Sequence, residues 1–411
     1  MRRLVTKFGG TSLGNGDLVR KAAKSVKNEW EKEDTQIAVV VSAMGGTTDS
    51  LIEAAKEGTK GKISQRELDS VMSMGEITSA KVFAAALESV GVDAEPVTPE
   101  SPKWPVITDG VYGNATPDLE RTRELVMKNV LPMLEDGTVP VLCGFLGKNE
   151  EGNITTLGRG GSDVTAFLIS NCLEATDVVL VTDAEGVMSA DPRKIGDSEI
   201  LDEITAEEIT DLARYGSKIV HHNALRYKDP DINAKVIHYR KGDLSSEGTI
   251  IKDSVPRTEE AKVEMYPKPL SMITVVGEDM QRTPGILNEI VGPLKESKIN
   301  IFGISIGPRS FSVYVTEERS REALDLVHDS VRESSVMKSA TCSEGVAMIL
   351  AESEEFIDTP GVISELSRPL AEEEINVIEI YSSQASISFF VNWGHRNEAY
   401  ELVKDRVDKI A

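Results

Sequence analysis

The chain has 411 residues, with a hydrophobic fraction of 40% and a charged fraction of 27%, the composition of a folded protein with large cores. At about 150 residues per domain, this length predicts two or three domains. The 68 Asp and Glu outnumber the 45 Lys and Arg, and the formal net charge is −23. Such a surface repels phosphate backbones and anionic lipid, which argues against nucleic acid and membranes as partners. It does not argue against a small anionic substrate held in a locally basic pocket.

Cysteine usage and the N-terminal sequence bear on the cellular compartment of the protein. Cys143, Cys172 and Cys342 are widely spaced and odd in number, which fits neither a disulfide framework nor a zinc site. The first residues lack the apolar core of a signal peptide, and no apolar run reaches the length of a membrane span. We therefore expect a cytoplasmic protein with no metal site built from its own side chains.

In chain order, the first 250 residues alternate short apolar runs with longer helical patterns. Continuous apolar runs are typical of strands buried on both faces, so we predict an open, mostly parallel α/β sheet sandwiched by helices. The predicted strands are residues 4–8, 37–42, 139–145, 178–182 and 235–238, and the clearest helices are 17–30, 65–90, 119–134 and 162–173.

Two glycine-rich loops follow predicted strands. After the first strand, Lys7 precedes Gly9 and Gly10, which would let backbone N–H groups approach phosphate oxygens beside a lysine charge. For a bare glycine pair, an ordinary tight turn is the better explanation, and neither GxxxxGK[ST] nor GxGxxG occurs. In the second loop, residues 155–163, Arg159 and three glycines precede Asp163 at a helix start. This favours an anion-binding nest over a simple helix cap.

Two later segments extend the candidate site. Ligands of open parallel sheets bind beyond the carboxyl ends of the strands, so the loop at 182–193 falls at the same edge as the glycine-rich loops. Lys218 could add a further cation, although a solvated lysine near a helix end is equally expected. His221 and His222 are adjacent and face different sides, which is poor metal geometry, and we assign them no role.

After residue 270 the sequence repeats itself with an offset of 76 residues, from Thr283 to Thr359, and no gap is needed. Each copy has the pattern strand, helix after Pro-Gly, strand, strand, helix. A closing strand for the second copy is missing or comes from elsewhere. We predict domains at 1–262, 270–343 and 344–411, with a turn-rich charged stretch before the repeats.

Together these motifs resemble those of the aspartokinases, a branch of the amino acid kinase family. The duplicated tail resembles the paired ACT modules, ferredoxin-like α+β domains, that follow the kinase domain in that family. The resemblance implies an amino acid kinase fold followed by two ACT modules. It rests on KFGGTS at 7–12, SAMGGTTD at 42–49, TTLGRGGSD at 155–163, TDAEGV at 182–187, ADPR at 190–193 and GSK at 216–218.

The resemblance implies transfer of the ATP γ-phosphoryl group to the side-chain carboxylate of L-aspartate, with Mg²⁺ bridging the phosphates. This reaction begins lysine, threonine and methionine biosynthesis. A carboxylate with a pKa near ~3.9 is already an anion at neutral pH, so the nucleophile needs no general base. Catalysis then reduces to positioning and charge neutralisation, which suits loops rich in Lys, Arg, Gly and hydroxyls.

Residue roles follow from the same resemblance. Lys7 would neutralise the transferring phosphoryl group, and Asp163 would orient the phosphate-binding groups. Arg159 would clamp a substrate carboxylate, and Glu76 would meet the substrate ammonium. Met188 departs from the family pattern, because a tyrosine is common there beside the adenine. Ser42 and Thr48 complete the substrate site, and the ATP site would comprise Lys7, Gly9, Gly10, Thr182, Asp183, Met188, Arg193 and Lys218.

The ACT modules imply a homo-oligomer, dimer or tetramer, and an amino-acid effector bound between modules. Phe302 stands where lysine-sensitive relatives carry Asp, which favours threonine, or no effector, over lysine. Modules that serve assembly alone are the alternative. The candidate effector residues are Asp279, Thr283, Gly285, Ile286, Asn300 and Ile301.

Two other functions compete with this interpretation. A sister kinase acting on another carboxylate or phosphate is opposed by the combination of Glu76 and Arg159. A catalytically dead amino-acid sensor on a kinase scaffold is opposed by the presence of Lys7, Arg159 and Asp163.

Overall fold

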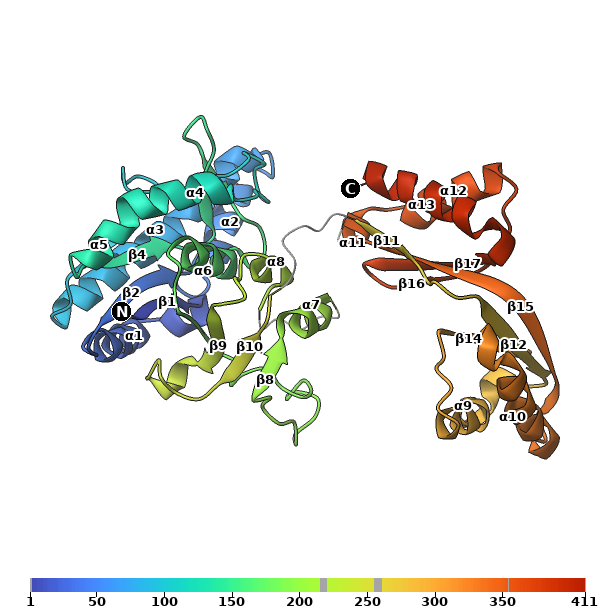
Figure 1. Cartoon of the computed structure of the whole chain (residues 1–411). Helices are drawn as coiled ribbons and strands as arrows, with labels where there is room; N and C mark the ends of the chain where they lie inside the picture. The colour runs from blue at the N-terminus through green and yellow to red at the C-terminus, as the bar shows by residue number, and fades with distance from the viewer. Residues whose placement is uncertain (1, 215–219, 255–260, 354, 411) are drawn as a thin grey trace. The chain divides into compact units, whose positions relative to one another are not determined.

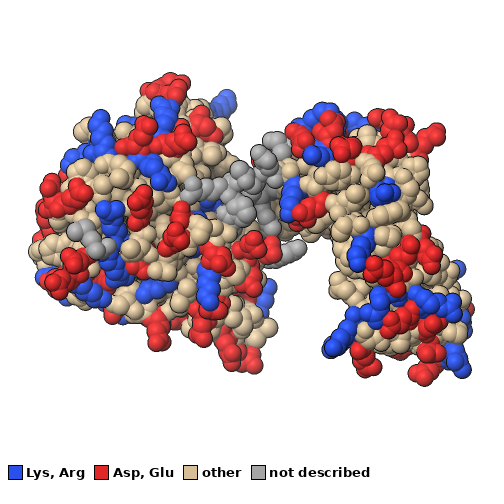
Figure 2. All heavy atoms as spheres, viewed as in Figure 1, with Lys and Arg blue, Asp and Glu red and all other residues tan. Residues whose placement is uncertain are grey.

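The computed structural model describes residues 2–214, 220–254, 261–353 and 355–410 (Figure 1). The chain forms two compact units, Met1–Arg257 and Thr258–Ala411. Acidic and basic side chains are interspersed over the visible face of each unit, so the acid excess forms no single acidic face there (Figure 2). No helix in the described ranges has the length and apolarity needed to span a bilayer.

The first unit is built on an eight-stranded sheet with the order β3-β4-β2-β1-β7-β9-β10-β8. The strands from β3 to β9 are parallel, and β10 runs antiparallel to β9. The central strands are almost wholly buried, which confirms the predicted parallel sheet. The strands are β1 (Arg2–Phe8), β2 (Thr35–Val41), β3 (Ala94–Val97), β4 (Val139–Cys143), β7 (Asp177–Thr182), β8 (Glu203–Thr205), β9 (Asn233–His238) and β10 (Thr249–Lys252).

Helices cover this sheet on both faces. Phe8 of β1 packs on Phe83 of α3 (Gln65–Ser89), whereas the preceding residue, Lys7, points to α6 (Gly161–Cys172) on the other face. The predicted helix at 119–134 is interrupted by a π-turn at Val126–Val130, just before Pro132, which has no N–H to donate. The other helices are α1 (Gly16–Trp30), α2 (Thr47–Gly58), α4 (Leu119–Leu125), α5 (Leu131–Glu135), α7 (Ala206–Arg214) and α8 (His222–Leu225), and β5 (Leu146–Lys148) pairs with β6 (Ile154–Thr156) in a hairpin.

The second unit contains both repeat copies in one seven-stranded sheet, with the order β13-β14-β12-β15-β17-β16 and β11 paired to β15. Each copy buries its own core beneath two helices, as the repeat predicts. The strands are β11 (Lys262–Met265), β12 (Leu270–Gly277), β13 (Gly303–Ile306), β14 (Ser310–Thr316), β15 (Met337–Glu352), β16 (Val377–Ser382) and β17 (Ser386–Asn392). The helices are α9 (Ile286–Glu296), α10 (Ser320–Glu333), α11 (Glu355–Asp358), α12 (Val362–Glu372) and α13 (Arg396–Ile410).

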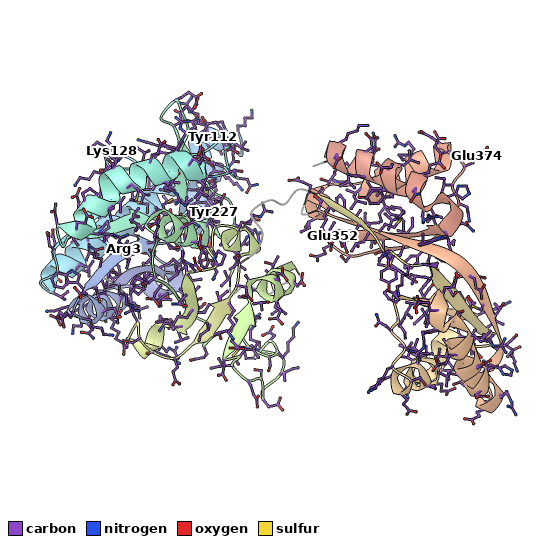
Figure 3. All side chains as sticks on the ribbon, in the orientation of Figure 1. Arg3, Tyr112, Lys128, Tyr227, Glu352 and Glu374 are labelled. Atoms are coloured by element: carbon purple, nitrogen blue, oxygen red, sulfur yellow. The ribbon has the colours of Figure 1, made fainter. Side chains whose placement is uncertain are left out.

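The closing strand of the second copy is β11, which precedes the first copy in the chain. Lys262 of β11 lies opposite Glu352, at the end of β15 labelled in Figure 3. Strand β15 is continuous across the proposed boundary at 343/344, because its first part pairs with β12 and its second part with β17. The units therefore divide at Arg257, earlier than our proposed boundary at 262, since β11 belongs to the second sheet.

Candidate active site

An ion pair lies at the carboxyl edge of the first sheet. Lys7 Nζ, near the end of β1, is 2.5 Å from Asp163 Oδ1 in the first turn of α6. Their side chains are only 13% and 12% exposed, so water screens this pair weakly. The structure thus brings together the two residues that we assigned catalytic roles, and they come from distant parts of the chain.

The loops after β1, β2 and β7 hold one another at this edge. The Gly9 N–H donates to the Val181 carbonyl at 3.0 Å, and the Ser42 N–H donates to the Phe8 carbonyl at 3.1 Å. A Cβ atom at Gly10 would lie 2.8 Å from the Ala43 carbonyl oxygen. Gly10 is therefore required for loop packing as well as for any approach to a ligand.

The start of α6 is also packed through glycines. Gly160 caps the helix with a φ of 72°, and a Cβ there would lie 2.1 Å from Cβ of His221. Burial lowers the pKa of His221, a residue that we assigned no role, and Asp163 opposes that shift. Arg159, just before this cap, is exposed and makes no hydrogen bond or ion pair within the described ranges. Its guanidinium is accordingly available to an anion.

Phe145 is a feature of this edge that the sequence did not reveal. It follows β4 with a φ of 69°, a left-handed backbone that is costly for an aromatic residue. Its N–H donates to Thr165 Oγ1 of α6 at 3.1 Å, and a Cβ at Gly161 would lie 2.7 Å from its ring. Helix α6 therefore holds the strained turn after β4 in place.

Glu76 is the most unusual group in the unit. It lies on α3 and is 3% exposed, although a lone helix carboxylate normally faces solvent. One carboxylate oxygen accepts the Ala43 N–H at 3.3 Å, and the other is buried without a hydrogen-bond partner among the described residues. Burial raises the pKa of the Glu76 carboxyl to about 7. Nearby on α3, Ser79 also has a buried hydroxyl without such a partner.

Asp69, on the same helix, shows the contrasting arrangement. It is fully buried, and its Oδ2 accepts the N–H groups of Gly113 and Thr156 at 2.9 and 3.0 Å. Its other oxygen accepts from Gln65 at 3.0 Å. Asp69 therefore ties α3 to the β5–β6 hairpin and has a structural role, which no sequence pattern indicated.

The remaining predicted substrate residues, Ser42 and Thr48, lie before α2 and in its first turn. Ser42 and Thr48 are both partly exposed, and Thr48 lies in the first turn of α2, behind the left-handed cap at Gly46. Free N–H groups at such a helix start favour anions. Ser42, directly after β2, borders the edge that carries Lys7 through its hydrogen bond to Phe8, and Thr48 lies at the start of the helix that follows.

The predicted ATP residues are less completely assembled. Thr182 ends β7 and donates to Asp183 at 3.2 Å, and Met188 forms an isolated bridge with Ile200. Arg193 is 85% exposed and forms a two-point ion pair with Asp191, at 3.0 and 3.1 Å. The Arg193 guanidinium lowers the pKa of Asp191. Lys218 lies outside the described residues.

The predicted effector residues form two separate groups. Asp279, with a φ of 52°, and Thr283 precede α9, and Gly285 caps it with a φ of 86°. Asn300 and Ile301 follow α9 and line a shallow pocket with Lys295 and Lys298. A helix of 11 residues is about 16 Å long, so one small amino acid cannot touch both groups within a single module.

Comparison with known proteins identifies both units. The model of the amino acid kinase family matches residues 2–238, and ACT domain models match residues 273–331 and 341–405. An aspartate kinase of Stutzerimonas stutzeri is 30% identical over 407 residues, covering 95% of this chain and 93% of that protein. An aspartokinase of Thermus thermophilus is 30% identical over 399 residues, covering 95% of each.

Solved structures share the fold. The crystal structure of aspartate kinase from Synechocystis matches with a TM-score of 0.80 and 24% identity, covering 98% of this chain and 69% of that one. The structure of E. coli aspartokinase III with aspartate and ADP matches with a TM-score of 0.56 and 24% identity, covering 98% and 99%.

Proposed function

We propose that this chain, which belongs to the aspartokinase family, transfers the γ-phosphoryl group of ATP to the side-chain carboxylate of L-aspartate, giving 4-phospho-L-aspartate and ADP. The observation that carries the proposal is the Lys7–Asp163 pair at the carboxyl edge of the sheet, in the same unit as the buried, half-satisfied carboxylate of Glu76. The E. coli relative solved with aspartate and ADP supports the choice of substrates.

In this proposal the Lys7 ammonium neutralises the charge on the transferring phosphoryl group. Asp163 holds the ammonium at the end of β1. The attacking carboxylate is already ionised, so no side chain has to remove a proton. The main contributions of the protein are therefore alignment and charge stabilisation.

Substrate recognition is proposed to use two charges of opposite sign. Glu76 would pair with the ammonium of aspartate, which supplies the partner that its second oxygen lacks. Arg159 would bind a substrate carboxylate through two parallel N–H bonds. Ser42 and Thr48 would add hydrogen bonds at the border of the same edge.

The nucleotide would lie along Gly9, Gly10 and the loop that begins at Thr182 and Asp183. Arg193 would exchange Asp191 for a phosphate oxygen, and Met188 would pack on the base, with Lys218 as a further cation. Mg²⁺ bound to the phosphates would supply charge neutralisation, and the exposed Asp183 offers it one carboxylate. The described residues contain no group of three or more His, Cys, Asp or Glu side chains that could hold a metal ion.

The second unit is proposed to regulate and assemble the enzyme as a dimer or tetramer. Threonine is our preferred effector over lysine, because Phe302 packs on Tyr266 where a carboxylate would be needed. The separation of the two candidate groups along α9 favours a site completed by another module. We place the enzyme in the cytoplasm, at the head of lysine, threonine and methionine biosynthesis.

Coupled ADP release with ATP–Mg²⁺ tests the reaction directly. The panel of acceptors is L-aspartate, L-glutamate, N-acetylglutamate and UMP, and we expect turnover with L-aspartate alone. Turnover with another acceptor would identify a sister kinase, and no turnover would favour the sensor. Repeating the assay with threonine, lysine and methionine tests regulation.

A further inference from the structure

One buried hydroxyl makes two hydrogen bonds to the backbone of the loop after β7. Thr249, the first residue of β10, is fully buried. Its Oγ1 accepts the Val187 N–H at 2.8 Å and donates to the Leu201 carbonyl at 2.7 Å. A hydroxyl has one proton to donate, and here that proton and one lone pair are both used by the backbone of the same loop.

The glycines around this contact fit the hydroxyl closely. A Cβ at Gly186 would lie 2.6 Å from Thr249 Oγ1, so a larger residue would push the loop off the hydroxyl. A Cβ at Gly248 would lie 2.1 Å from the Val236 carbonyl oxygen, so Gly248 lets β10 approach β9. Close packing at Gly186 on the loop and at Gly248 beside β9 therefore fixes the distance between the Thr249 hydroxyl and the loop.

The two groups that Thr249 joins, the Val187 N–H and the Leu201 carbonyl, lie at the two ends of one loop. The Leu201 N–H also donates to the Val187 carbonyl at 2.8 Å, and Met188 forms a bridge with Ile200. The segment between them carries Met188 and Arg193, and Asp183 lies just before it. Thr249 thus closes the base of the segment that holds two of the proposed nucleotide residues, Met188 and Arg193.

We propose that Thr249 is a positioning residue for ATP, acting through the backbone of Val187 and Leu201, and this inference rests on the proposed function. Strand β10 is also the last strand before the unit boundary at Arg257. The residue that fixes the nucleotide loop therefore belongs to the strand from which the chain leaves the catalytic unit.

The test is the isosteric substitution Thr249→Val, which keeps the shape and removes both hydrogen bonds. We expect the KM for ATP to rise roughly tenfold, from the loss of about two backbone hydrogen bonds. We expect kcat and the KM for aspartate to stay within about twofold of wild type. Thr249→Ser, which keeps the hydroxyl, should restore the KM for ATP.

The matched control is Thr122→Val. Thr122 is also fully buried, and its hydroxyl accepts a backbone N–H, that of Ile107 at 3.2 Å, but it lies on α4, outside the nucleotide loop. Gly186→Ala is a second route to the same displacement and should also raise the KM for ATP. Thermal unfolding of each variant shows whether the unit is folded.

Two results would overturn the inference. One is an active Thr249→Val enzyme whose KM for ATP equals that of wild type or of Thr122→Val. The other is a Thr249→Ser enzyme as impaired as Thr249→Val. If wild type shows no aspartate-dependent turnover, the proposed reaction fails, and the role of Thr249 is then judged from the rise in Tm that ATP–Mg²⁺ produces. A smaller rise in Thr249→Val than in Thr122→Val supports the role, and equal rises refute it.

Discussion

Two sets of buried polar groups, one in each unit, differ in whether the protein itself supplies their hydrogen-bond partners. In the catalytic unit, Glu76 and Ser79 each carry a buried oxygen with no hydrogen-bond partner among the described residues. In the second unit, the buried Tyr314 donates its hydroxyl to Glu379 at 2.7 Å, and Tyr381 donates to the same oxygen at 3.0 Å. Unpaired buried groups are costly unless a ligand completes them, whereas satisfied networks specify architecture.

The satisfied network joins the two ACT copies. Tyr314 of the first copy lies 4.2 Å from Phe390 of the second, measured between ring centroids, in a small apolar cluster separate from the core of each copy. At the repeat offset of 76 residues, Tyr314 corresponds to Phe390, and Glu379 corresponds to Gly303. The hydrogen bond therefore forms in only one of the two symmetry-related positions, and it distinguishes the copies.

This comparison predicts a division of mutational effects. Substitutions at the incomplete catalytic groups should remove activity and leave stability nearly unchanged. Substitutions at the completed Tyr314–Glu379 network should lower stability and leave the chemistry unchanged.

The largest effect is expected from Lys7→Ala. Loss of the ammonium removes charge stabilisation from the transferring phosphoryl group, and we expect kcat to fall roughly 10³-fold. Asp163 keeps its favourable place at the start of α6, so Tm should change by only a few degrees. Steady-state kinetics and thermal unfolding measure both, with Lys81→Ala as a control, because Lys81 pairs with Glu100 at the surface. Near-normal turnover in Lys7→Ala would refute the catalytic role.

Glu76→Gln should have the next largest effect, a rise of roughly tenfold or more in the KM for aspartate. In wild type, the Glu76 carboxyl, whose pKa burial raises to about 7, gains its charge as the pH rises from 6 to 8. The KM for aspartate should therefore fall over that interval in wild type and stay flat in Glu76→Gln.

Stability provides an independent check on Glu76. Its pKa is raised from an ordinary value of 4.5, so the unfolded chain loses this proton first as the pH rises. The contribution of the protonated group to stability is full below about pH 4.5 and is lost as the pH approaches 7. Glu76→Gln should lack this component of the pH dependence of Tm. An unchanged pH profile in the variant would show that another group titrates.

Local signals explain why much of the fold could be predicted from the sequence. The helix at 17–30 begins beside a cap at Asn15, whose side chain accepts the Leu18 N–H, and the helix at 65–90 begins with a reciprocal Ser64–Glu67 capping box. Strand β11 has no comparable signal, because it is four residues long and half charged. Its place depends on pairing with Ile349–Glu352, far along the chain.

The site was predictable to a similar degree and for similar reasons. Lys7 and Asp163 both belong to loops at the carboxyl edge, so the parallel topology alone predicted their proximity. Arg193 shows the limit, because its ion pair with Asp191 depends on the local turn geometry. Asp69 and Thr249 could not be found, since a buried Asp or Thr has the same sequence appearance as an exposed one.

Substitutions in the Tyr314–Glu379 network between the copies should lower stability and leave activity unchanged. Tyr314→Phe or Glu379→Gln should lower the Tm of the second unit by about 3–6 °C, from the loss of roughly 1–2 kcal/mol, and leave kcat unchanged. Because the two groups share one bond, the double variant should lose little more than the worse single variant. Fully additive losses would show that the bond does not couple the copies.

Phe390→Tyr is the matched control for that network. It places a hydroxyl at the symmetry-related position, where Gly303 offers no carboxylate, and a gain in Tm there would contradict the asymmetry.

The smallest effect compares the copies directly through Gly285→Ala and Gly361→Ala. Both glycines cap a helix, with φ of 86° and 88°, and among the described residues no atom beyond the neighbouring residues of the chain lies within 4 Å of an added Cβ at either position. Each substitution should therefore cost only the backbone strain, about 1 kcal/mol, and lower Tm to the same extent. Because the proposed effector residues lie in the first copy, only Gly285→Ala should also weaken inhibition by threonine. If Gly361→Ala weakened inhibition by threonine equally, the effector would bind both copies. The sequence difference between Gly303 and Glu379 would then affect assembly alone.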